Sequence, residues 1–200
     1  MKEHGSVLRF GFAALVILFL VASAAAETKA TCAAGKTGKP AAITAREAWE
    51  LASPRARAWQ ADAVPFDLTT TSSGPLDAAG RSTDWDVKFS SPSAKAVDMI
   101  GISDGQIRCF AVAGAGGQVI HFDDKIILDS KKLYETAQKA GGEKLGPGAR
   151  VMAGLVPARG GRGSGENWYL NYQNAEGREV LSVVLDARTG AVTDVFHTEK

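Results

Sequence analysis

The chain has 200 residues, of which 45% are hydrophobic, and its 23 basic and 22 acidic residues leave a formal net charge of +1. A charge this close to zero gives no electrostatic steering toward nucleic acid or an anionic membrane surface. We therefore expect neither nucleic acid nor, once the leader is removed, a membrane among the partners of this protein.

The N-terminus is typical of a secretory signal peptide. Lys2 and Arg9 form a basic start, residues 11–21 are a continuous apolar run, and residues 24–26 are alanines suited to cleavage. The apolar run is shorter than the about 20 residues that span a bilayer, so a retained anchor is the less favoured alternative. The sequence therefore predicts a signal peptide over residues 1–26 and a periplasmic or secreted mature chain.

The predicted export of the chain bears on the state of its two cysteines. An exported chain folds in an oxidising compartment, where two cysteines most simply form one disulfide. Cys32 precedes the first predicted helix, and Cys109 lies within an alternating apolar segment. We predict a bond between them. The alternative is a reactive thiol at Cys109, but no histidine lies near it in the sequence to activate it.

A flexible lead-in and a helix open the mature chain. Residues 27–42 are rich in Ala, Gly, Lys and Thr, which predicts an irregular segment. Thr44 and Glu47 then have the spacing of a capping box, and Trp49 shares one helical face with several alanines. Pro54 either stops this helix or restarts it.

Beyond this helix the apolar period changes from 3.6 to two, which is the period of a strand. Turn signals separate the alternating segments, the strongest being Asp104–Gly105. Residues 43–113 therefore predict one helix followed by a meander of about four antiparallel strands. The alternating segments lie at residues 64–68, 85–89, 96–103 and 107–111.

The second half repeats this order. Residues 114–127 are expected to form a connector, and Asp129 or Ser130 caps a helix that stops at Gly141. Residues 128–200 form the second predicted unit. Its strands are predicted at residues 150–156, 168–173, 178–186 and 191–196.

The two halves are similar in sequence, which indicates an internal repeat. Residues 43–52 line up with residues 128–137, and further on Trp85 lines up with Trp168. The predicted fold class is therefore α+β, with two tandem units that each pack one helix on a small antiparallel β-sheet. Each of the two tryptophans is expected to lie buried beneath the helix of its own unit.

The second half resembles the PepSY domain. Residues 168–192 contain an aromatic strand, a hairpin, and the ending Leu-Asp-Ala-Arg-Thr-Gly-Ala-Val, which is similar to the family pattern Val-Asp-Ala-x-Thr-Gly-x-Val. The first half is a degenerate match. The resemblance implies a PepSY/cystatin-like fold without catalytic residues, which binds proteins or restrains peptidases. Asp186 and Gly190 have structural roles in a turn, as an acceptor for backbone amides and a site for positive φ.

Apolar residues remain on the face of each predicted sheet that is turned away from its helix. They are Val97, Met99, Val180 and Val184. A half-solvated sheet is polar at such positions. We interpret these four residues as a candidate partner surface or as the contact between the two units.

Two other motifs have residue types that could carry chemistry. His121 lies beside Asp123 and Asp124, but the mature chain has no His or Cys pair at zinc spacing, so a solvated strand edge is favoured. Residues 159–165 are glycine-rich and basic but lack the Gly-Lys-Ser/Thr ending and the following helix of a phosphate site. We therefore nominate no catalytic residue, cofactor or metal ligand.

The sequence favours an exported, non-enzymatic protein that binds a protein partner. Restraint of a peptidase is implied by the PepSY resemblance. The alternative is a structural or accessory subunit of a bacterial envelope assembly, and a hydrolase ranks third because no catalytic set is recognisable.

Overall fold

The computed structural model describes residues 34–112, 122, 125–126, 128–157 and 166–198. The predicted signal peptide, Cys32, the His121 motif and the 159–165 loop lie outside these residues. The helices and strands are β1 (Gly35–Lys36), α1 (Ala45–Trp59), β2 (Val64–Thr70), β3 (Asp84–Ser91), β4 (Ala96–Ser103), β5 (Gln106–Val112), α2 (Ser130–Lys139), the 3₁₀ helix η1 (Gly142–Leu145), β6 (Arg150–Pro157), β7 (Glu166–Gln173), β8 (Glu179–Asp186) and β9 (Val192–His197).

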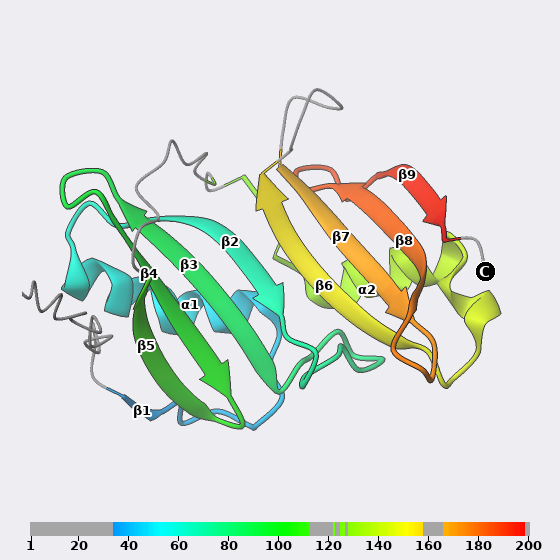
Figure 1. Ribbon diagram of the computed structural model, residues 1–200, viewed down its shortest axis with the longest axis horizontal. Coiled ribbons are helices and arrows are strands. Elements are labelled where there is room, and N and C mark those ends of the chain that lie inside the picture. The colour runs from blue at the N-terminus through cyan, green and yellow to red at the C-terminus, as the bar shows by residue number, and fades with distance from the viewer. Residues whose placement is uncertain (1–33, 113–121, 123–124, 127, 158–165, 199–200) are drawn as a thin grey trace, which may run out of the picture.

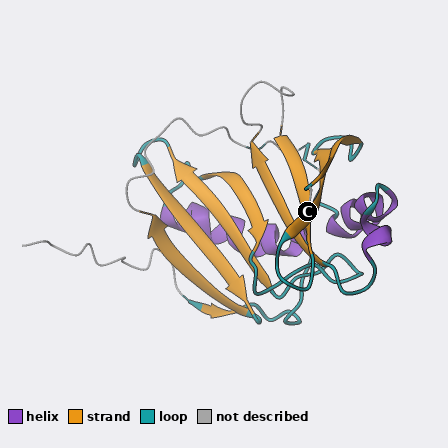
Figure 2. Cartoon of the chain, turned by 45° about the vertical axis from the view of Figure 1, so that its right-hand side comes forward, coloured by secondary structure: helices purple, strands orange, loops and turns teal. Residues whose placement is uncertain are grey.

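The strands form one antiparallel sheet, in the order β1-β5-β4-β3-β2-β6-β7-β8-β9 (Figure 1). Both α-helices lie on the same face of this sheet, as the two views together show (Figures 1 and 2). The opposite face carries neither helix, and we call it the uncovered face. Among the described residues, no helix is long and apolar enough to cross a membrane.

The predicted fold class is wrong, because the structure does not contain two tandem helix-on-sheet units. Strand β2 pairs with β6 through Leu68–Leu155 and Thr69–Gly154, which joins all nine strands into one β-rich sheet. Two separate small sheets would each leave a row of backbone donors and acceptors at an open edge. Pairing the two edges satisfies part of these groups, and the Thr70 hydroxyl extends the junction by accepting from the Ala153 amide at 2.9 Å.

Helix α1 begins and continues for reasons visible in its side chains. The Thr44 hydroxyl accepts from the Glu47 amide, and the Glu47 carboxylate accepts from the Thr44 amide, which completes the predicted capping box. The helix neither stops nor restarts at Pro54 but continues to Trp59. Just before the proline, the Ser53 hydroxyl donates to the Trp49 carbonyl at 2.8 Å.

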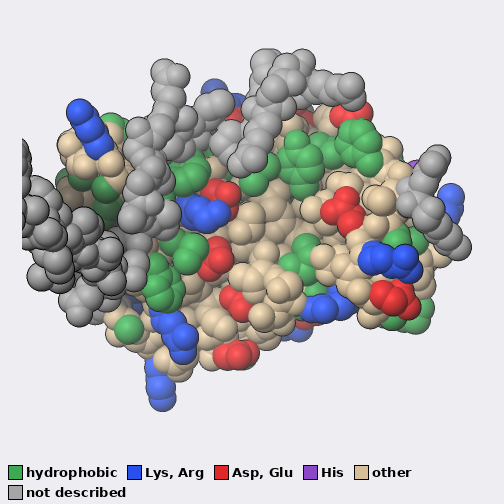
Figure 3. Space-filling model, viewed as in Figure 1, with side chains coloured by type: hydrophobic (Ala, Val, Ile, Leu, Met, Phe, Trp, Pro, Cys, Tyr) green, Lys and Arg blue, Asp and Glu red, His purple; other side chains and the backbone are tan. Residues whose placement is uncertain are grey.

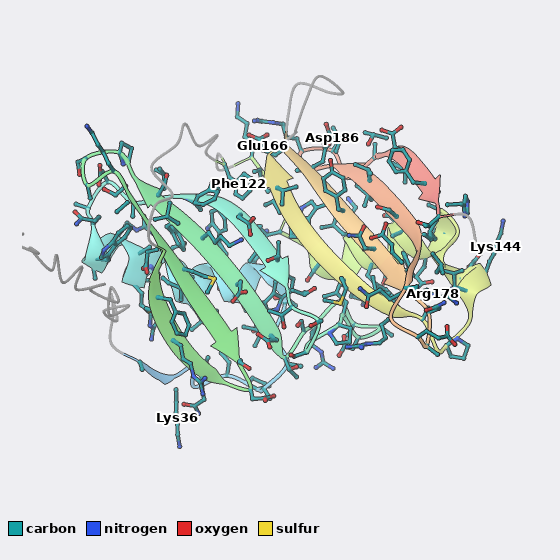
Figure 4. The ribbon with its side chains drawn as sticks, viewed as in Figure 1. Lys36, Phe122, Lys144, Glu166, Arg178 and Asp186 are labelled. Carbon is teal, nitrogen blue, oxygen red and sulfur yellow. The ribbon has the colours of Figure 1, made fainter. Side chains whose placement is uncertain are left out.

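The core lies between the helices and the sheet. Four alanines of α1 are 0% exposed, so this helix presents a smooth stripe that approaches the strands closely. Trp85 and Trp168 fill the space below and are also 0% exposed. The connector contributes too, because Phe122 beside β2 (Figure 4) stacks on Trp49 with ring centroids 6.3 Å apart. The alanines are Ala45, Ala48, Ala52 and Ala56.

Candidate functional site

The uncovered face mixes apolar and charged side chains rather than being uniformly polar (Figure 3). Strand pairing sets several of them in one row across the middle of the sheet, and the opposed side chains of an antiparallel pair share a face. This row contains Gly101, Asp86, Thr69, Gly154, Tyr169 and Val184.

A groove of about 480 Å³ opens in this row, where β2 meets β6. We call it the Gly154 groove. Apolar side chains line part of it, while Tyr169, Asn171 and two threonines contribute polar atoms. Its lining residues are Thr69, Thr70, Met152, Ala153, Gly154, Val156, Tyr169 and Asn171.

Gly154 contributes to this groove by carrying no side chain. Its neighbours Ala153 and Leu155 face the core, so a side chain at position 154 would project into the groove. A Cβ atom there would lie 3.2 Å from the Thr69 side chain, which is a tight contact, so the glycine also accommodates Thr69 on the neighbouring strand. The pairing of β6 with β7 runs through Gly154 without a register shift, so the glycine does not serve a bulge. Glycine inside a regular strand often marks a place where a ligand or another backbone approaches closely.

Asp86 gives the groove an electrostatic neighbour. It pairs with Thr69, which pairs with Gly154, so Asp86 lies two strands away, or roughly 10 Å at the usual strand spacing. Partial burial, followed by the charge of Asp84, raises the pKa of the Asp86 carboxyl above its ordinary value. No ion pair to Asp86 is formed within the described parts of the chain, whereas nearby Asp67 pairs with Lys88 at 3.3 Å. This carboxylate would therefore be stabilised by an incoming cation.

The four residues predicted from the sequence as a partner surface do not form one patch. Val97 and Val184 are 3% and 4% exposed, and the strands that carry them, β4 and β8, are separated by four others. Met99 is half-buried beside Lys88. Val180 lies at the register shift of β8 and packs against the core. A binding role for these four residues stays a prediction.

The turn after β8 has the predicted structural role. The Asp186 carboxylate accepts from the amides of Arg188 and Thr189 at 2.9 and 2.7 Å, and Gly190 has a φ of 71°. These hydrogen bonds, that from the Thr189 amide foremost, lower the pKa of the Asp186 carboxyl. Glu166 lies near this turn (Figure 4) and forms an ion pair of 3.1 Å with Arg188. All these groups serve the turn itself.

Sequence reasoning missed Gly154, Asp86 and Tyr169. The available signal was a glycine at an outward position inside the apolar segment Val151–Val156. The pairing of Asp86 with Thr69, and of Thr69 with Gly154, cannot be predicted from the residues next to them in the sequence. In the segments that the structure describes, no three His, Cys, Asp or Glu side chains are grouped to hold a metal ion.

Comparisons with known proteins inform the fold. No protein-family model matches the chain, and no curated protein matches it. The structure is similar to the crystal structure of a "putative lipoprotein" from Clostridium difficile 630, with a TM-score of 0.51 and 12% sequence identity. The similarity covers 78% of this chain and 93% of that protein. At this level of identity the likeness is one of fold alone.

Proposed function

We propose that this chain is an exported, non-enzymatic protein that binds an extended segment of a partner protein in the Gly154 groove. The observation that carries the proposal is the juxtaposition of this groove with Asp86 on the uncovered face. The signal-like N-terminus supports export, and the description of the structural neighbour as a lipoprotein is compatible with it. The PepSY resemblance of residues 168–192 supports a protein as the partner.

The chemistry of the groove defines the partner segment. Met152 and Val156 favour an apolar side chain, while the Tyr169 hydroxyl and the Asn171 amide can bond the backbone of a bound segment. Asp86, roughly two strand spacings away, favours a Lys or Arg. The expected segment is therefore extended and carries an apolar residue and a basic residue on the same side.

The test is capture of the partner from the envelope extract of the producing cell, with four variants of the chain. Gly154→Leu fills the groove, and Asp86→Asn removes the charge. Gly35→Leu is the control for a strand glycine, because nothing lies within 4 Å of a Cβ atom at Gly35. Glu135→Gln on α2 is the control for a lost carboxylate.

Loss of one defined protein with both groove variants, and its retention by both controls, is the expected result. Equal capture by all four folded variants would contradict the proposal. The identity of the captured protein then separates the two functional classes. A peptidase whose activity falls on binding supports restraint, and a stable assembly component supports the accessory-subunit alternative.

A further inference from the structure

The sheet ends in an edge strand that is open in an unusual way. Every residue of β9 is exposed, and β9 is the last strand on its side of the sheet (Figure 1). Within the described residues, five large hydrophobic side chains are exposed, and three of them, Val192, Val195 and Phe196, lie on this strand. Natural edge strands are usually protected by charged side chains, especially lysine, by proline, by bulges or by shortness. β9 has neither lysine nor proline; its protection is limited to the carboxylate of Asp194 and a register shift near its first residues.

The opposite edge is protected in the usual way. β1 is two residues long, and one of these is Lys36, whose side chain points away from the sheet (Figure 4). The contrast makes β9 the place where the sheet can add another strand.

The backbone groups available at β9 can be assigned. The Thr198 amide donates to the Val180 carbonyl of β8, so residue 198 bonds inward. Hydrogen bonding alternates along an antiparallel strand. Val195 and His197 are an odd number of residues from Thr198, so they do not exchange hydrogen bonds with Val183 and Leu181, the residues opposite them on β8. Their N–H and C=O groups therefore point outward, away from β8.

We propose that β9 pairs with β9 of a second copy, antiparallel about a two-fold axis at Val195, to form a closed dimer. In this register the two Val195 residues exchange backbone hydrogen bonds, Phe196 stands opposite Asp194, and no like charges meet. An axis at Asp194 would set two carboxylates opposite each other, which is unfavourable. Because both copies use the same edge, no β9 edge remains and assembly stops at two.

The test introduces charges of opposite sign at the axis, in protein recovered after export. Val195 is 38% exposed, so Val195→Lys and Val195→Glu leave the core intact. Each variant alone sets like charges opposite each other and should weaken dimerisation by about tenfold or more. An equimolar mixture of the two should restore the dimer, as measured by analytical ultracentrifugation. Phe110→Lys on β5, at a site 39% exposed, should dimerise as the unchanged chain does.

Hydrogen exchange provides a second measurement that needs no variant. The amides of Val195 and His197 should be protected at high protein concentration and should lose protection on dilution. A chain that is monomeric at every concentration, single variants that stay dimeric, or a mixture that stays monomeric would each overturn the proposal. The proposal would also be overturned if the chain is a monomer that captures another protein and if Val195→Lys abolishes that capture. The edge would then be the binding site of that protein.

This dimer is independent of the Gly154 groove. Asp86→Asn should abolish partner capture without changing the dimer, and the Val195 variants should change the dimer without filling the groove. Failure of one proposal is therefore distinguishable from failure of the other.

Discussion

The backbone amide of Ala45, the first residue of α1, donates a hydrogen bond of 3.1 Å to the hydroxyl of Ser130, the first residue of α2. The same hydroxyl donates to the Gly80 carbonyl at 2.6 Å, and Ser130 is 1% exposed. One buried side chain therefore joins the N-termini of both helices to a loop of the first half. This contact, together with the β2–β6 pairing, ties the two halves of the chain into one structure.

Ser130→Ala should lower the free energy of unfolding by about 2 kcal/mol, because it leaves a buried amide and a buried carbonyl without their partner. Thr136→Ala is the matched control, since among the described residues that exposed hydroxyl bonds only the Lys132 carbonyl of its own helix. The control should change stability by less than about 0.5 kcal/mol. Urea denaturation of both variants measures the difference. Equal losses of stability would show that the hydrogen bonds of the Ser130 hydroxyl do not stabilise the contact between the two halves.

Tyr172→Phe should stabilise the fold by about 1 kcal/mol. The Tyr172 hydroxyl is buried and has no hydrogen-bond partner among the described residues, and burial raises its pKa above the ordinary value. An unsatisfied buried polar group is costly, so its removal is favourable. Thermal unfolding measures the change, and a loss of stability would indicate a partner for the hydroxyl.

Gly142→Ala should be strongly destabilising for a related reason. A Cβ atom at Gly142 would clash with the Tyr172 hydroxyl oxygen and with the adjacent ring carbon. The expected loss is about 2 kcal/mol, as for overpacking of a core. Gly148→Ala is the control, because nothing lies within 4 Å of a Cβ atom there. Combining Gly142→Ala with Tyr172→Phe should recover part of the loss, since the nearest atom is removed.

Asp86→Asn should raise stability while abolishing partner capture. The pKa of Asp86 is raised above its ordinary value of 3.8, chiefly by burial and then by Asp84. The folded state therefore holds a proton more tightly than the unfolded state, so the free energy of unfolding falls as the pH rises from the ordinary Asp range through the raised pKa. In the variant, the free energy of unfolding should not fall over this pH range. At neutral pH it should be about 0.5 kcal/mol higher than in the unchanged chain, allowing for solvent screening. A profile identical to that of the unchanged chain would contradict this.

Trp85→Ala and Trp168→Ala should each cost about 3–5 kcal/mol, the range for removing a large buried side chain. Both side chains are 0% exposed, and the Trp85 indole also donates to the Ile43 carbonyl at 3.0 Å. Phe110→Ala, at a 39% exposed site, should cost less than about 1 kcal/mol. Guanidinium denaturation compares the three variants, and a small loss for either tryptophan would contradict its central place in the core.

The Cys32–Cys109 disulfide stays a prediction, because Cys32 lies outside the described residues. Cys109 is 4% exposed on β5. Mass analysis of protein taken from the envelope, alkylated without reduction, should show no modified thiol. The same measurement locates the predicted cleavage near residue 26. Two alkylated thiols would refute the disulfide.

Local signals in the sequence determined the positions of both α-helices and of strands β2 to β9, but not those of β1 and η1. The capping residues Thr44 and Asp129 lie where the two helices begin, and Asp186 and Gly190 form the turn that their spacing predicts. Such features act through hydrogen bonds that span a few residues, so they are visible in a short stretch of sequence. The export signal and the internal repeat are of the same kind and stay predictions.

Only the tertiary structure decided how the strands join. The β2–β6 pairing, the hollow at Gly154 and the position of Asp86 beside it depend on which two strand edges meet, and an alternating pattern does not specify this. The pattern shows which side of a strand is buried, whereas edge pairing is decided by backbone groups that are the same at every residue. Two sheets with open edges and one continuous sheet therefore share the same local sequence signals, and the continuous sheet forms because it leaves fewer backbone groups without partners.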